Sequence, residues 1–179
     1  MNKFTDIMRE KFSDGLISAM SNKHDYTIGK LEKSHNIVSM NISLTEQCNF
    51  RCDYCYETFT NDIISDETLE KTIKFLYESN SEMVEFWMFG GEITTVPEKI
   101  LFATRKIVEL REKYNKKIVR IIYFTNGYIF DESLWSNVRN ILNNSGVSGI
   151  IQVSYDGLNG MNYARKNAGR NLIDLPAFK

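Results

Sequence analysis

The chain has 179 residues and a mass of 20.8 kDa, with 22 Lys and Arg against 23 Asp and Glu, which gives a net charge of -1 at pH 7. This balance provides no positive field for a nucleic-acid backbone or an anionic membrane surface, and a hydrophobic content of 42% is typical of a globular domain. No stretch reaches the roughly 18 apolar residues that cross a bilayer, so we expect a globular protein without nucleic-acid or membrane partners.

The first predicted elements are a helix, a strand and a second helix. Apolar residues at helical spacing between Phe4 and Met20 predict an N-terminal helix, so we expect residues 1–35 to form a helix and loop ahead of a main domain at 36–179. Apolar and polar residues alternate over 38–44, which predicts a strand. Ser65, followed by two acidic residues, predicts the start of the second helix.

The rest of the chain continues to alternate between strand and helix patterns. We expect strands at 83–89, 118–124 and 149–155, and helices at 97–114 and 131–142. Strands separated by helices require right-handed crossovers and a parallel sheet, so the fold class is α/β.

Polar or glycine-containing segments follow all four predicted strands. In parallel α/β folds the functional residues gather at the carboxyl ends of the strands. Those ends are followed here by a cysteine-containing loop and by Gly90-Gly91-Glu92, Thr125-Asn126-Gly127 and Ser154-Tyr155-Asp156-Gly157. The sequence therefore predicts one site at this edge of the sheet.

The three cysteines of the chain, Cys48, Cys52 and Cys55, lie within eight residues and have the spacing C-x3-C-x2-C. An odd, clustered set favours metal binding over disulfides. Three thiolates can hold an iron–sulfur cubane and leave one iron without a protein ligand. Structural zinc requires four ligands, and the sequence has no fourth cysteine, so that only His24 and His35, outside the motif, are left as candidates for a fourth zinc ligand. A zinc site and a thioredoxin-like Cys52/Cys55 pair remain as alternatives.

With Tyr54 before the third cysteine and Thr45-Glu46 before the first, this loop resembles the signature loop of the radical S-adenosylmethionine (radical SAM) enzymes. The resemblance implies a [4Fe-4S] cluster held by the three cysteines, with SAM chelated to its open iron. Gly90-Gly91-Glu92 resembles the family's glycine-glycine-glutamate motif, whose backbone and carboxylate receive the SAM ammonium group.

The remaining strand-end residues resemble later motifs of the same family, in which polar side chains contact SAM or the substrate. The residues that the resemblance assigns to cofactor binding are Tyr54, Gly90, Gly91, Glu92, Thr125, Asn126, Ser154 and Asp156. It identifies no side chain as a catalytic acid or base. The motifs look most like the peptide-modifying, sulfatase-maturase-like branch, although Asp156-Gly157-Leu158 departs from the Asp-Gly-Pro often seen there.

The resemblance implies reductive cleavage of SAM to methionine and a 5′-deoxyadenosyl radical, which abstracts hydrogen from a peptide or small-molecule substrate. An electron donor such as flavodoxin or ferredoxin and a reducing cytoplasm are implied with it. The family core is usually a partial TIM-type barrel of six βα units, and we count about four. Three interpretations stay open: a radical SAM enzyme or its N-terminal portion, half of a split enzyme whose second chain supplies the missing barrel half, and a noncatalytic zinc or iron–sulfur interaction module.

Overall fold

The computed structural model describes residues 37–156 and 165–166. The helix predicted between Phe4 and Met20 lies outside the described residues. The elements, in chain order, are β1 (Ile37–Thr45), β2 (Arg51–Cys52), α3 (Asp66–Tyr77), β3 (Met83–Gly90), the short 3-10 helix η1 (Ile93–Thr95), α4 (Pro97–Tyr114), β4 (Ile118–Thr125), α5 (Glu132–Leu142), β5 (Val147–Val153) and β6 (Arg165–Lys166).

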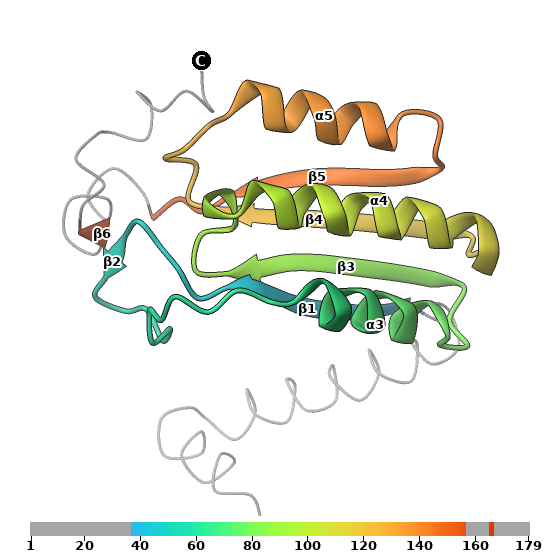
Figure 1. Cartoon of the computed structure of the whole chain (residues 1–179), viewed down its shortest axis with the longest axis horizontal. Coiled ribbons are helices and arrows are strands. Elements are labelled where there is room, and N and C mark those ends of the chain that lie inside the picture. Colours follow the sequence, from blue (N-terminus) through green and yellow to red (C-terminus); the bar gives the residue numbers. More distant parts are fainter. Residues whose placement is uncertain (1–36, 157–164, 167–179) are drawn as a thin grey trace, which may run out of the picture. The chain divides into compact units, whose positions relative to one another are not determined.

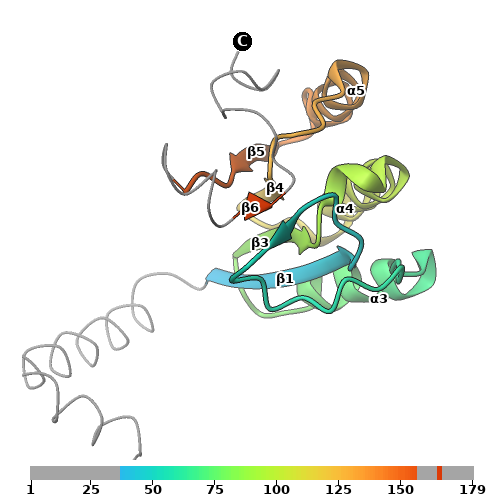
Figure 2. The same cartoon turned by 90° about the vertical axis from the view of Figure 1, so that its left-hand side faces the viewer.

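Four of the strands form one sheet in the order β1-β3-β4-β5, and every neighbouring pair is parallel. Helices α3, α4 and α5 connect successive strands and lie on the same face of the sheet (Figures 1 and 2). The predicted α/β fold with a parallel sheet is confirmed. All four strands therefore end at the same edge, where the predicted site residues lie.

The helices begin where the sequence supplies partners for their first backbone N–H groups. The side chains of Ser65 and Asp131 accept hydrogen bonds from the first turns of α3 and α5, and Pro97, which has no N–H to satisfy, opens α4. These starts agree with the sequence predictions. Within the described ranges, none of the helices combines the length and the apolar character needed to cross a membrane.

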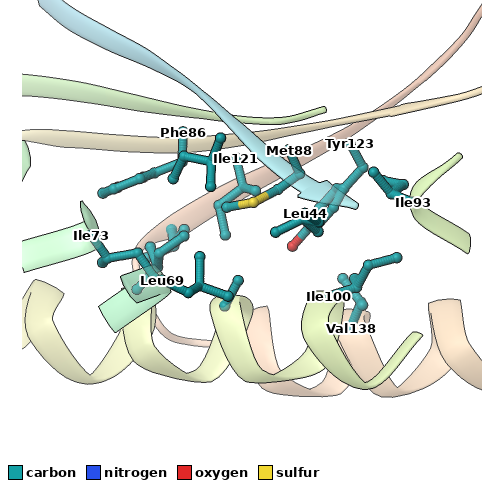
Figure 3. Packing of buried hydrophobic residues seen from close by; sticks show 14 of the residues in the cluster. Leu44, Leu69, Ile73, Phe86, Met88, Ile93, Ile100, Ile121, Tyr123 and Val138 are labelled. Carbon is teal, nitrogen blue, oxygen red and sulfur yellow. The ribbon is translucent and has the colours of Figure 1, made fainter. Parts of the chain in front are cut away.

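The core lies between the sheet and its three helices (Figure 3). Because strand side chains alternate between the two faces, every second residue of a central strand points toward the helices. The residues labelled in Figure 3 are Leu44, Leu69, Ile73, Phe86, Met88, Ile93, Ile100, Ile121, Tyr123 and Val138. The one hydroxyl among them is satisfied, since the oxygen of Tyr123 lies 2.8 Å from Oγ1 of Thr104.

The other face of the sheet is only partly covered. Residues 83–89 form the predicted strand, and a mostly apolar run of this kind is typical of parallel strands that are buried on both faces, but Glu85, Trp87 and Phe89 are half-buried. The difference arises because the three described helices all pack against one face. Aromatic rings instead cover this open face near the strand ends, where Phe124 packs against both Trp87 and Phe89.

A second, two-stranded sheet lies beyond the carboxyl ends of the parallel strands (Figures 1 and 2). β2 and β6 pair in antiparallel fashion, with Cys52 opposite Arg165. The cysteine loop is therefore joined by backbone pairing to a segment more than 100 residues away. The sequence predicted neither strand, because two-residue strands carry no periodic pattern.

Replacing Leu69 by alanine tests the packing of α3. Leu69 is fully buried, so we expect Leu69→Ala to lower the free energy of unfolding by about 2–5 kcal/mol. Phe75→Ala is the matched control, because Phe75 lies on the same helix with 68% of its surface exposed, and we expect it to change stability by about 0.5 kcal/mol or less. Urea titration followed by circular dichroism measures both. Equal effects of the two substitutions would contradict the assigned face of α3.

Candidate functional site

The candidate site is a pocket of about 170 Å³ at the carboxyl ends of the parallel strands. All three cysteines line it. The predicted cofactor residues that also line it are Tyr54, Gly90, Gly91, Thr125, Asn126 and Ser154. The structure thus brings together side chains and backbone from the cysteine loop and from the ends of β3, β4 and β5. Glu92 and Asp156 do not line the pocket, and each instead contacts a residue that does.

Sequence reasoning missed several residues that line the pocket: Phe50, Tyr56, Glu57, Phe89 and Phe124. Phe89 and Phe124 directly precede the predicted residues Gly90 and Thr125. The two-residue period of β3 and β4 was the available signal, because it places both rings on the face opposite the helices. They give the pocket an aromatic wall.

The cysteine loop folds back on itself around the three half-buried cysteines. The backbone N–H of Phe50 donates to Sγ of Cys48 at 3.3 Å, and the N–H of Cys55 donates to the carbonyl of Cys52 at 3.1 Å. The Arg51 guanidinium donates to the carbonyl oxygens of Cys48 and Phe50, both at 2.7 Å. Hydrogen bonds within the loop therefore help to set its shape.

Burial raises the pKa of the Cys48 thiol above its usual value, and the negative charges of Glu92 and of the other two cysteines raise it further. The N–H of Phe50 opposes this shift, because it stabilises the thiolate. Together these contributions favour the protonated thiol of Cys48. Thiolate ligation of metal releases that proton.

Gly90 and Gly91 bring the end of β3 against the start of the cysteine loop. A Cβ atom at Gly90 would lie 2.2 Å from the carbonyl oxygen of Thr45, and one at Gly91 would lie 2.2 Å from that of Gln47. Gly90 also has a φ of +125°, which side chains rarely tolerate. A hydrogen bond stabilises this close approach of the two segments, since the N–H of Gly91 donates to the Thr45 carbonyl at 2.8 Å.

Glu92 is fully buried, and its carboxylate connects the ends of β3 and β4. Oε1 accepts hydrogen bonds from the N–H and hydroxyl of Thr94 at 3.1 and 2.7 Å and from the Thr125 hydroxyl at 2.6 Å. Oε2 accepts from the N–H of Asn126 at 2.6 Å. The backbone N–H of Glu92 donates to the carbonyl of Gln47 at 2.7 Å. The residue thus holds three loops of the pocket together.

A side-chain hydrogen bond joins β4 to the cysteine loop. Nδ2 of Asn126 donates to Oδ1 of Asn49 at 2.8 Å, and Asn49 follows Cys48 directly in the chain. Asn49 could not be predicted from the sequence, because a polar residue in a loop has no pattern that distinguishes it. Asn126 therefore contacts both Glu92 and the neighbour of a cysteine.

A second side-chain contact joins the cysteine loop to the segment after β5. The hydroxyl of Tyr54 donates to Oδ2 of Asp156 at 2.5 Å, and both residues are exposed. The backbone N–H of Ser154 donates to the Thr125 carbonyl at 2.9 Å, which continues the pairing of β4 and β5. Asp156 therefore lies at the site through its contact with Tyr54.

Comparison with known proteins places this site in a family. A model of the radical SAM superfamily matches residues 42–167, a range that includes the cysteine loop and the ends of all four parallel strands. The chain therefore belongs to the radical SAM superfamily. The parallel sheet with helices on one face is consistent with part of that family's TIM-like barrel.

Two relatives show how much of a larger protein the chain resembles. It is 29% identical over 140 residues to the GTP 3′,8-cyclase of Helicobacter pylori (strain J99 / ATCC 700824), which covers 74% of this chain and 40% of that protein. It also matches the structure of native anSMEcpe with bound AdoMet and Cp18Cys peptide, at 29% identity and a TM-score of 0.54, over 73% of this chain and 34% of that chain. The chain thus spans less than half the length of either relative.

The superfamily implies a [4Fe-4S] cluster and SAM, and the donor set of the pocket fits such a cluster. Three cysteine sulfurs lie on one loop beside one pocket, and thiolates are the ligands that iron–sulfur clusters use. Within residues 37–156 and 165–166, no three His, Cys, Asp or Glu side chains are arranged around a point that would hold a single metal ion. An iron–sulfur cluster does not require the three thiolates to converge on one point, because each thiolate bonds to a different iron.

Replacing the Glu92 carboxylate by an amide tests its role in joining the loops. Glu92→Gln places an N–H donor among backbone and hydroxyl donors, so we expect the free energy of unfolding to fall by about 2–4 kcal/mol. Glu112→Gln removes an exposed carboxylate and should cost about 0.5 kcal/mol or less. Chemical denaturation of both variants provides the comparison. A loss for Glu92→Gln no larger than that of the control would contradict the role of this carboxylate.

Proposed function

We propose that this chain holds a [4Fe-4S] cluster through Cys48, Cys52 and Cys55 and binds SAM in the adjoining pocket. When bound, these groups supply reductive cleavage of SAM to methionine and a 5′-deoxyadenosyl radical, which takes hydrogen from a substrate. The observation that carries the proposal is that three cysteines and the ends of β3, β4 and β5 line one pocket.

In this proposal, the residues around the pocket bind and orient SAM. Backbone groups of Gly90 and Gly91 lie on the pocket wall and are available to the SAM ammonium group. Thr125, Asn126 and Ser154 supply polar groups for its carboxylate and ribose, and Tyr54 lies beside the third cysteine. We assign Glu92 mainly to holding these groups in place, because its carboxylate already accepts four hydrogen bonds.

The aromatic side of the pocket has a separate role. Phe89 and Phe124 line the pocket, and Trp87 extends the same apolar surface along the open face of the sheet. An apolar wall excludes water, and the C–H bonds of the aromatic rings that face the pocket are too strong to be good hydrogen donors to a radical. We propose that it shields the reaction on the side from which substrate approaches.

The substrate in this proposal is a peptide or a small molecule. One relative was solved with a bound peptide, and the other is named for a nucleotide reaction. We propose a small electron carrier such as flavodoxin or ferredoxin as the reductant and a reducing compartment such as the cytoplasm as the setting, because an open cluster is sensitive to oxygen.

Anaerobic reconstitution with iron and sulfide tests the proposal. We expect about four iron and four sulfide per chain, and formation of 5′-deoxyadenosine after SAM and a chemical reductant are added. Cys48→Ala, Cys52→Ala and Cys55→Ala should each abolish both results, because no other cysteine can replace the missing ligand. Phe75→Ala, on the exposed side of α3, should retain both.

The outcomes of this experiment separate the proposal from its alternatives. Uptake of zinc without iron would contradict the cluster and favour a metal-binding module. An intact cluster that yields no 5′-deoxyadenosine would contradict SAM cleavage by this chain alone. In that case half of a split enzyme is the second candidate, and it is favoured by the edge strand β5, where Ile150 and Ile151 are 44% and 43% exposed.

A further inference from the structure

The pocket has one charged side chain to which the proposed function gives no role. Glu57 lines the pocket and is half-buried. The other side chains on the wall are aromatic rings, cysteines and neutral hydroxyl or amide groups. The Glu92 carboxylate does not belong to this wall and already accepts four hydrogen bonds. Among the residues that the structure describes, Glu57 therefore supplies the one carboxylate on the pocket wall.

The carboxylate of Glu57 has no counter-charge within residues 37–156, where it forms neither a salt bridge nor a hydrogen bond. The cation nearest to it in the sequence, Arg51, is engaged elsewhere. Its guanidinium donates to two carbonyl oxygens of the cysteine loop and lies over the ring of Phe59, with Cζ 4.5 Å from the ring centroid. A half-buried charge beside aromatic rings is stabilised when an opposite charge binds next to it. The pocket is therefore better suited to a cationic ligand than to a neutral one.

SAM carries such a charge on its sulfonium sulfur. S-adenosylhomocysteine (SAH) has the same ammonium, carboxylate and adenosine groups but a neutral thioether sulfur. We propose that the Glu57 carboxylate stabilises the sulfonium charge of SAM and is thereby the specificity-determining residue that makes the pocket prefer SAM to SAH. This inference rests on the proposed function, because it requires SAM to bind in this pocket.

The size and lining of the pocket support a direct electrostatic effect. The pocket has a volume of about 170 Å³, so a charge inside it stays within several ångströms of each wall. Opposite charges at such a separation attract each other more strongly beside an apolar surface than in water. Phe89 and Phe124 provide that surface, and aromatic rings themselves attract cations. Glu57 adds a full negative charge to this attraction.

Anaerobic equilibrium dialysis of the reconstituted chain, without a reductant so that SAM stays intact, tests the role of Glu57. We expect Glu57→Gln to weaken SAM binding about tenfold and SAH binding about twofold or less, because the amide keeps the size of the side chain and removes its charge. Glu57→Asp keeps the charge and should retain most of the preference for SAM. Sinefungin, which has an amine-bearing carbon in place of the sulfonium sulfur, should lose affinity in Glu57→Gln as SAM does.

Asp53→Asn is the matched control. It removes a carboxylate two residues before Cys55, and Asp53 does not line the pocket. We expect it to change the ratio of the SAM and SAH affinities by about twofold or less. Iron content and electron paramagnetic resonance (EPR) of the reduced cluster establish that the variants compared hold the same cluster.

Each outcome decides between the inference and the function on which it rests. A wild-type chain that takes up no iron, or that takes up iron and binds no SAM, overturns both. If the wild-type chain binds SAM and Glu57→Gln weakens SAM and SAH equally, the inference is overturned and the proposed function stands. A Glu57→Gln chain that takes up no iron while Asp53→Asn does also overturns the inference, because the carboxylate would then shape the cysteine loop rather than select the ligand.

Discussion

The buried carboxylate of Glu92 is the interaction on which the site depends. Parallel strands have their carboxyl ends at one edge of a sheet, but the parallel strand pairing itself does not extend into the loops beyond those ends. Glu92 supplies that connection through Thr125 at the end of β4, through Asn126 directly after it, and through its own N–H to Gln47 of the cysteine loop. A charged acceptor fully enclosed by donors is stable only while all of them are present, so the loops are fixed together.

The glycine pair and the carboxylate have complementary effects on the same junction. Gly90 and Gly91 allow the backbone of β3 to approach the carbonyls of Thr45 and Gln47, where any Cβ atom would overlap them. The carboxylate of Glu92 then binds Thr125 at the end of β4 and Asn126 directly after it. The resemblance had assigned these three residues to SAM, and the structure gives them a second role in placing the cysteine loop. Backbone groups of the glycines still line the pocket.

The sequence predicted the parts of the fold that repeat a local pattern. Ser65, Pro97 and Asp131 have local chemistry that starts helices, and the apolar periods of the strands identified the sheet. The single covered face was not predicted, because an apolar run such as 83–89 is equally consistent with burial on both sides. The pairing of β2 with β6 was missed because it depends on contacts across more than 100 residues.

In the candidate site, too, the sequence identified the residues that lie in local motifs and missed those that are placed by contacts between distant segments. Cys48, Cys52, Cys55 and the strand-end motifs were found because their spacing is characteristic of a family, and the structure brings most of them to one pocket. Asn49 was missed, since its contact with Asn126 exists only after the loops meet. Phe89 and Phe124 were missed as wall residues because their position depends on which face of the sheet the helices leave open.

The most direct test of the central claim is the EPR spectrum of the reduced, reconstituted chain before and after addition of SAM. A cluster held by three cysteines has one iron open to a ligand, so the account predicts that SAM changes the g values of the signal. A reduced cluster whose spectrum is the same with and without saturating SAM would contradict it.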